Sequence, residues 1–197
     1  KGEIALYRGT DPADASTFEK VGVISIAPPI AGHRSLAKLG GDLLILCRLG
    51  LFKLSQILSS KAGITKELSL TDRINSAFTR AVTAYASNVH WQVLAYPQEQ
   101  ALIVNIPVTS SYSEQYVMNT LTGAWARFVG WFGQNFCLHN EKLYCAGSGR
   151  VDLMWDGTSD NGSAIRGRAQ SAYNYFGQRG KRKQIKLISP NRQTTAN

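Results

Sequence analysis

Residues 42–54, DLLILCRLGLFKL, have an echo in residues 141–153, EKLYCAGSGRVDL, 99 positions further along the chain. Both stretches have an acidic residue before an apolar run, then a glycine, then a second apolar stretch that ends on leucine. The positions in register pair Asp42 with Glu141, Leu44 with Leu143, Gly50 with Gly149, and Leu54 with Leu153. Each copy has the pattern of a β-hairpin. A spacing near a hundred residues equals two units of about fifty, which is the period of four-stranded propeller blades.

The composition is that of a globular protein, with 197 residues of which 44% are hydrophobic. No apolar run approaches the roughly 20 residues of a membrane-spanning helix, because the longest, residues 43–47, lies between Asp42 and Arg48. Three cysteines are an odd number, which favours reduced thiols over a disulfide framework. The first residues, KGEIALYRGTDP, alternate like a strand and lack an initiating Met, so we interpret Lys1 as internal to a longer protein.

Strand and helix patterns divide the chain into blade-like units. A helical period over residues 74–85, which Ser69 or Thr71 would cap, interrupts the strands. Four strands then follow over residues 89–96, 101–106, 115–119 and 124–129, and further strands lie at 135–139, 143–146 and 151–155. We therefore expect a mainly β domain of antiparallel four-stranded units, β-propeller-like and either a complete propeller or part of one, with one inserted amphipathic helix. The units span about 1–54, 89–129 and 131–190, and the helical insertion spans about 55–88.

Three glycines are predicted to set the hairpin turns, because glycine readily takes the positive φ that closes a tight turn. They are Gly50, Gly123 and Gly149.

The chain resembles a family of virion proteins at GEIALYRGTDPADASTFEKVG, GGDLLILCRLGLFKLS, QYVMNTLTGAWARF, HNEKLYCAG and TSDNG. These segments are similar to the propeller-bearing tail proteins of short-tailed bacteriophages, of the nozzle or tail-accessory type. The resemblance covers most of residues 2–190 and implies a structural tail component that has no enzymatic activity and no cofactor. It also implies a ring oligomer around the channel through which DNA leaves the capsid. The expected partners are other copies of the chain, other tail or portal-adaptor proteins and, in passing, phage DNA, and the protein would be made in the bacterial cytoplasm and reside in the virion.

Two groups of residues suggest metal ligands. Cys137, His139 and Cys145 are residue types that bind zinc, but a two-residue turn at 140–141 would place the two sulfurs on opposite faces of a sheet. We therefore interpret the cysteines as small core residues. The acidic stretch at residues 156–162, DGTSDNG, lacks the glycine and glutamate positions of an EF-hand loop and indicates a turn. We predict no metal site.

Catalytic motifs are absent from the sequence, which has no G-x-S-x-G, H-E-x-x-H or phosphate-binding loop. Glu99 and Glu114 are candidates for a glycosidase pair, although carboxylates in loops are commonly just solvated. We predict no catalytic residues. The alternative function is a receptor- or glycan-binding tail module, which predicts exposed tryptophans, whereas a structural subunit predicts that Trp91, Trp125, Trp131 and Trp155 fill the core.

The basic residues gather near the C-terminus, since no acidic residue follows Asp160. Contact with a neighbouring protein, contact with DNA and plain solvation all fit this charge, and we favour the protein contact. A nucleic-acid-binding domain is therefore a second alternative function. The candidate contact residues are Arg179, Lys181, Arg182, Lys183 and Lys186, with Arg73 and Arg80 on the predicted helix as a second group.

Overall fold

The computed structural model describes residues 2–14, 16–30, 34–60, 64–160, 162–165, 175, 177 and 179–184. The chain divides into two compact units, residues 1–156 and residues 157–197. The first unit consists of antiparallel sheets with helical segments between the second and third of them. This confirms the mainly β class and the inserted helix that the sequence predicted.

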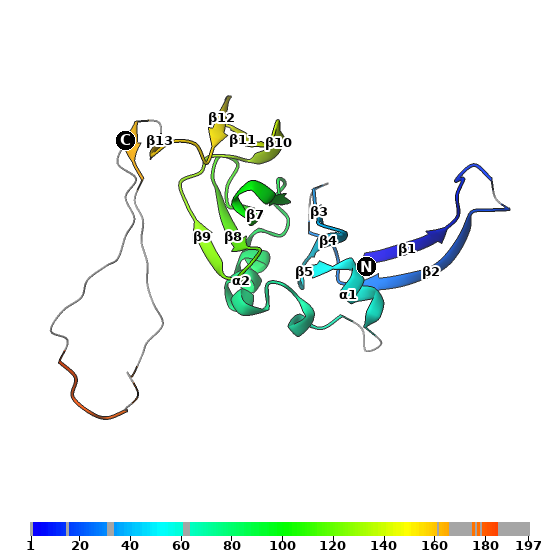
Figure 1. The fold of residues 1–197 in the computed structure, drawn as a ribbon, viewed down its shortest axis with the longest axis horizontal. Helices are drawn as coiled ribbons and strands as arrows, with labels where there is room; N and C mark the ends of the chain where they lie inside the picture. Colours follow the sequence, from blue (N-terminus) through cyan, green and yellow to red (C-terminus); the bar gives the residue numbers. More distant parts are fainter. Residues whose placement is uncertain are drawn as a thin grey trace. The chain divides into compact units, whose positions relative to one another are not determined.

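A hairpin of two strands begins the first unit, and it comprises β1 (Gly2–Arg8) and β2 (Glu19–Ile26) (Figure 1). Its loop is closed by short-range bonds, since the Asp11 carboxylate accepts from the Ala13 amide at 2.9 Å and Asp14 accepts from Ser16. The two aspartates therefore act as turn formers in this loop.

A three-stranded sheet follows, which we call the leading sheet: β3 (Leu36–Leu39), β4 (Asp42–Cys47) and β5 (Gly50–Lys53). Helix α1 (Leu54–Ser59) continues directly from β5, and its N-cap residue, Lys53, makes no side-chain cap. The Asp42 carboxylate supplies the cap from β4, because it accepts from the Ser55 amide at 3.2 Å and from the Ser55 hydroxyl at 2.5 Å. These bonds satisfy donors that the start of a helix leaves open.

The helical insertion continues with η1 (Lys66–Leu68), η2 (Asp72–Ile74) and α2 (Asn75–Tyr85). Helix α2 buries Phe78 and Ala81 in the core, as the helical period predicted. The prediction of a Ser69 or Thr71 cap is wrong, because neither η2 nor α2 has a side-chain cap. The Thr71 hydroxyl is instead buried against β5, where it accepts from the Leu51 amide at 3.3 Å.

The central sheet has the order β6-β7-β8-β9, which confirms the predicted four-stranded meander. Its strands are β6 (Gln92–Tyr96), β7 (Ala101–Pro107), β8 (Ser113–Asn119) and β9 (Trp125–Phe128), and η3 (Pro97–Glu99) joins the first two. Every residue of β7 is buried, because both faces of this strand are covered. Leu102 and Val104 face the leading sheet and α2, whereas Ala101 and Ile103 face the sheet that follows.

The trailing sheet comprises β10 (Asn135–His139), β11 (Lys142–Gly147) and β12 (Arg150–Met154). Cys137 pairs with Tyr144 and Phe136 pairs with Cys145, which confirms the predicted two-residue turn at 140–141. Both turn residues have positive φ, 46° at Asn140 and 62° at Glu141, as a type I′ turn requires.

The three sheets stack face to face, with the central sheet between the other two. One core joins the leading sheet and α2 to the central sheet, and a second core joins the central sheet to the trailing sheet. Along one side, β6 lies between β3 and β10. Arg34, just before β3, forms a parallel bridge to Gln92 of β6, and the Gln92 side-chain amide forms two hydrogen bonds with the backbone of Phe136 in β10. The first strands of the three sheets are therefore neighbours.

The strand positions correct the register of the sequence echo. Strand β4 begins at Asp42 and β11 begins at Lys142, so equivalent strands are 100 residues apart, not 99. The echo nevertheless has an offset of 99, an odd number. Leu44 and Leu143 are both fully buried, and they point toward the central sheet from its two sides. A shift of one residue exchanges the two faces of a strand, so leucines on opposite faces of equivalent strands recur with an odd offset. The echo therefore reflects two facts: the hairpin is repeated, and the leading and trailing sheets both pack against the central sheet.

The second unit contains a short hairpin of β13 (Ser159–Asp160) and β14 (Ser163–Ala164). Gly162, in its turn, has a φ of 81°, which agrees with the turn predicted for this acidic stretch. Asn161 of that stretch, and residues 166–174, 176, 178 and 185–190 of the third predicted unit, lie outside the described residues.

Candidate functional site

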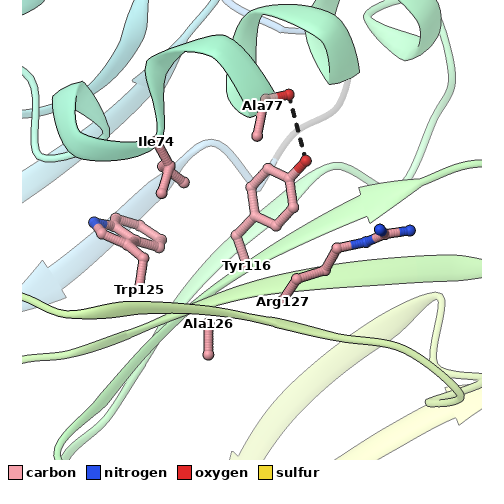
Figure 2. A pocket seen from close by; sticks show the side chains of 6 residues that line it. All are labelled: Ile74, Ala77, Tyr116, Trp125, Ala126 and Arg127. Carbon is pink, nitrogen blue, oxygen red and sulfur yellow. Dashed lines mark hydrogen bonds between the residues drawn. The ribbon is translucent and has the colours of Figure 1, made fainter. Parts of the chain in front are cut away.

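A small cavity lies between helix α2 and the last strands of the central sheet. Ile74 and Ala77 of the η2–α2 segment, Tyr116 of β8, and Trp125, Ala126 and Arg127 of β9 line it, and its volume is about 110 Å³. Figure 2 shows the rings of Tyr116 and Trp125 directed from the sheet toward the helix.

The two aromatic residues of this cavity are fixed by hydrogen bonds to the helical insertion. The Tyr116 hydroxyl donates to the Ala77 carbonyl at 3.3 Å, and the Trp125 indole donates to the Leu70 carbonyl at 3.0 Å. Burial raises the pKa of the Tyr116 phenol, so this hydroxyl keeps its proton as a donor. Ligand pockets commonly have volumes of roughly 300–1,000 Å³, so this cavity is too small for a sugar ring or a nucleobase. We interpret it as a packing gap under α2.

The glutamates proposed as a glycosidase pair lie at opposite ends of strand β7. Glu114 is opposite Ile106 in the register, whereas Glu99 precedes Ala101 in the turn before the strand. Five residues of strand correspond to about 17 Å, which exceeds the separation of roughly 5–9.5 Å in glycosidases. Glu114 is bound to Arg127, which donates from Nε at 2.9 Å, and this bond to Glu114 raises the pKa of the Arg127 guanidinium. Glu114 therefore acts as an ion-pair partner on the sheet surface.

The cysteines and His139 do not converge. Cys145 is buried between the central and trailing sheets, whereas Cys137 lies on the other face of the trailing sheet and is exposed. The expectation that the cysteines are core residues is thus right for Cys47 and Cys145 and wrong for Cys137. In the part of the chain that the structure describes, no three His, Cys, Asp or Glu side chains form a group that could hold a metal ion.

The four tryptophans differ in exposure. Trp91 is buried beside Val93 in the first core, and Trp125 and Trp131 are half-buried. Trp155 is 39% exposed, although its ring contacts Tyr96 and Phe128 with centroid distances of 6.0 and 5.6 Å.

The conformation of Trp155 supports a packing role. Its φ of 60° costs on the order of 1 kcal/mol for a residue of this size. The aromatic contacts, including one to Trp131 at 5.5 Å, hold it there and close the end of the core between the central and trailing sheets. Trp91 fills the core as a structural subunit predicts, Trp125 and Trp131 pack half-buried against the cores, and the exposed Trp155 departs from that prediction.

The three predicted turn glycines occupy different positions. Gly123 and Gly149 have φ of 67° and 76° in the turns before β9 and β12. Gly50 is the first residue of β5, opposite Cys47, and the two turn residues precede it. A Cβ at Gly50 would lie 2.7 Å from the Cβ of Ser69, so this position needs glycine because the segment before η2 passes close to the strand.

The two arginines of the helical insertion are exposed. Arg80 lies on α2 with the exposed Thr79 and Thr83, whereas Arg73 lies in η2, which precedes this helix. Arg73 approaches the β8–β9 turn, since one of its guanidinium nitrogens lies 3.7 Å from the Cβ position of Gly123. These two arginines remain accessible for a contact.

The basic C-terminal segment belongs to the second unit. Residues 179–183 are exposed, and the Arg179 guanidinium lies over the Tyr175 ring, 4.8 Å from its centroid. Lys186, the last of the proposed contact residues, lies outside the described residues.

Two apolar surfaces and one pair of inter-sheet hydrogen bonds, which we call the clamp, were not evident from the sequence. The surfaces are the outward faces of the β1–β2 hairpin and of the trailing sheet, where Val23 and Val151 are 49% and 69% exposed. The clamp is Gln92, which exchanges two hydrogen bonds with the backbone of Phe136. The signal for the surfaces was present, because apolar residues occupy both alternating sets of positions in these strands.

Comparison with known proteins yields no relative. No protein-family model, no curated protein and no solved structure matches the chain. No helix among the residues of the described ranges is long and apolar enough to cross a membrane.

Proposed function

We propose that the chain is a structural component of a bacteriophage tail, a ring-forming subunit of the nozzle type that lines or extends the DNA exit channel. It acts by assembly with its own copies and with other virion proteins. The proposed fold is a β-propeller or part of one, in which the leading, central and trailing sheets are successive blades. The resemblance of the strand and turn segments to tail proteins of short-tailed phages supports this assignment.

One observation carries the proposal: the three sheets repeat one arrangement. Their first strands, β3, β6 and β10, are neighbours, and each later strand lies one step further out. Equivalent positions, which are 100 residues apart, face the preceding part of the chain in both the leading and the trailing sheet. Ile45 faces the β1–β2 hairpin, and Cys145 faces the central sheet. Sheets that follow one another with the same orientation are the arrangement of propeller blades.

The surface chemistry of the first unit also supports a structural role. The carboxylates proposed for glycan hydrolysis are far apart along β7, and the cavity beside α2 is small. Of the tryptophans that a glycan-binding module would expose, Trp91 is buried in a core, Trp125 and Trp131 pack against the cores, and Trp155 is exposed. Apolar sheet faces and the exposed arginines of the helical insertion, Arg73 and Arg80, remain as surfaces for contact, and contact surfaces are what an assembly subunit requires.

The proposal is tested on particles and on the purified chain. An antibody against the chain should label virions released from the host that carries its gene, at the tail, in electron microscopy. Native mass measurement of the purified chain should give a closed oligomer of defined copy number. A chain that is absent from particles and strictly monomeric in solution would overturn the assignment.

A second candidate function is contact with nucleic acid through the basic C-terminal segment. The exposed Lys181 and Arg182, next to the Arg179–Tyr175 pair, combine positive charge with an aromatic ring. Duplex binding through this segment would weaken with salt. Lys181→Gln with Arg182→Gln would reduce the log–log salt slope by about 1.8, which is about 0.9 for each phosphate that is no longer neutralised. Binding that is absent or independent of salt would exclude this function.

A further inference from the structure

The trailing sheet has an apolar face that the described residues of the first unit leave open. On the side opposite the central sheet, Tyr144 lies between Cys137 and Leu153 in register, and Ala146 is paired with Val151. Val151 is 69% exposed, Leu153 is 36% exposed, and Cys137 is exposed as well. A row of apolar side chains across three strands is the kind of sheet face that proteins normally cover.

The leading sheet shows what covers the equivalent face. At positions 100 residues earlier, Leu44, Leu46 and Leu51 are fully buried. They pack against the apolar face of the next sheet and against α2. A second antiparallel sheet surface is therefore a suitable occupant for the outer face of the trailing sheet.

The β1–β2 hairpin carries a second apolar surface. Its inner face packs on the outside of the leading sheet through Ile4, Ile24 and Ile26. Its outer face is open, because Ala5 is exposed opposite Val23, and Tyr7, which stacks on Phe18 and lies opposite Lys20, is 55% exposed. A hairpin of two strands has little stability alone, so packing on both faces would be favourable.

These two surfaces lie at opposite ends of the stack of sheets. The hairpin covers the leading sheet, the central sheet comes next, and the open face belongs to the trailing sheet. Packed sheets are about 10 Å apart, so the hairpin of a chain is separated from its own trailing face by the thickness of the whole stack. The hairpin that reaches a given trailing face must therefore come from another copy.

We propose that the outer face of the β1–β2 hairpin of one copy packs on the outer face of the trailing sheet of the next copy. Two different surfaces that meet in this way form a head-to-tail contact, and such contacts close into rings when the rotation between copies allows it. The inference rests on the proposed ring-forming function and identifies the surfaces that join its subunits.

Cys137 provides a native reporter for this contact, because it lies on the trailing face while Cys47 and Cys145 are buried. In the assembled protein, N-ethylmaleimide should modify Cys137 at least about tenfold more slowly than in the dissociated chain, as expected for a side chain in an interface core. Mass spectrometry of the cysteine-containing peptides measures each rate separately.

Charge substitutions then test the pairing of the two faces. Val23→Glu and Val151→Lys should each weaken association by about tenfold or more, since each places a charge in an apolar contact. Combining them should restore part of the association, because the two charges attract across the contact. Leu121→Glu is the matched control, since Leu121 is 74% exposed in the β8–β9 turn, and it should leave the oligomer unchanged.

The outcomes separate this inference from the proposed function. An oligomer in which Cys137 reacts as fast as in dissociated chains, or which tolerates both single substitutions, refutes this interface and leaves a ring subunit possible through other surfaces. Slow modification of Cys137 in the dissociated chain also refutes it, because another segment then covers the face. A monomeric chain that is absent from particles overturns the function and the interface together.

Discussion

Gln92 makes two of the hydrogen bonds that join the central sheet to the trailing sheet, beside the one from the Asn105 amide to the Gln134 carbonyl. Gln92 is 6% exposed, its amide donates to the Phe136 carbonyl at 2.7 Å, and it accepts from the Phe136 amide at 2.8 Å. Gln92→Met keeps the length of the side chain but removes both the donor and the acceptor. The free energy of unfolding should fall for that reason.

The size of this effect follows from the two bonds. Each hydrogen bond contributes a net 0.5–1.5 kcal/mol, about 1–3 kcal/mol for the pair, and a buried backbone group left without a partner costs roughly 1–3 kcal/mol more. Partial access of water to the Phe136 backbone would reduce the second part. We therefore expect Gln92→Met to lower the free energy of unfolding by about 2–4 kcal/mol.

Urea denaturation followed by tryptophan fluorescence measures the loss, with an unchanged m-value as the sign of an intact fold. Gln98→Met in the exposed turn before β7 is the matched control and should change stability little. Opening of the joint would also speed the alkylation of Cys145, which lies in the core between the two sheets. A difference below about 0.5 kcal/mol between the two methionine variants would refute the clamp.

Other substitutions test the local arguments in the same way. Gly50→Ala should lower the unfolding free energy by about 1–3 kcal/mol because its Cβ overlaps the segment before η2, whereas Gly41→Ala, with no atom within 4 Å, should not; equal stability of the two variants would contradict the close approach. The hydrogen bond from the Ser55 hydroxyl is the largest cause that lowers the pKa of Asp42 below its ordinary value of 3.8. The stabilisation by this carboxylate is therefore complete above pH 3.8, and it is lost as the pH falls through the lowered pKa. The stability difference between the native chain and Asp42→Asn, measured by urea denaturation across this range, should therefore shrink in acid, and a constant difference would exclude the cap. Burial raises the pKa of Cys47, so a thiol reagent should modify it only as fast as the chain unfolds, and rapid modification under native conditions would show that this core is open.

Much of the fold was predictable because its local rules are strong. The sequence correctly predicted three elements: the central meander, the two-residue turn at 140–141 and the helical period of α2. Turn residues and side-chain alternation act over a few neighbouring residues, so a local pattern is enough to predict them. The caps were not predictable in the same way. Thr71 could cap a helix by its type, but its hydroxyl bonds to β5, and α1 receives its cap from Asp42 at a distance of 13 residues in sequence.

The contact surfaces were harder to foresee than the strands. Val23 and Val151 look like ordinary core residues in the sequence, and only the packing of the sheets leaves them exposed. The basic residues of the helical insertion and of the C-terminal segment were evident from their charge alone. Charge is a property of the residue type, whereas exposure of an apolar side chain depends on which elements meet over it.

The sequence by itself determined the hairpins, their turns and the mainly β class, because these follow from short-range alternation and backbone preferences. The tertiary structure decided what the echo at residues 42–54 and 141–153 means. Equivalent strands of the two sheets are 100 residues apart. Leu44 and Leu143 lie on opposite faces of these strands, because each faces the central sheet, and the offset between the leucines is therefore 99. A pattern in one chain cannot reveal which neighbour a buried face has, since that depends on contacts between residues far apart in the sequence.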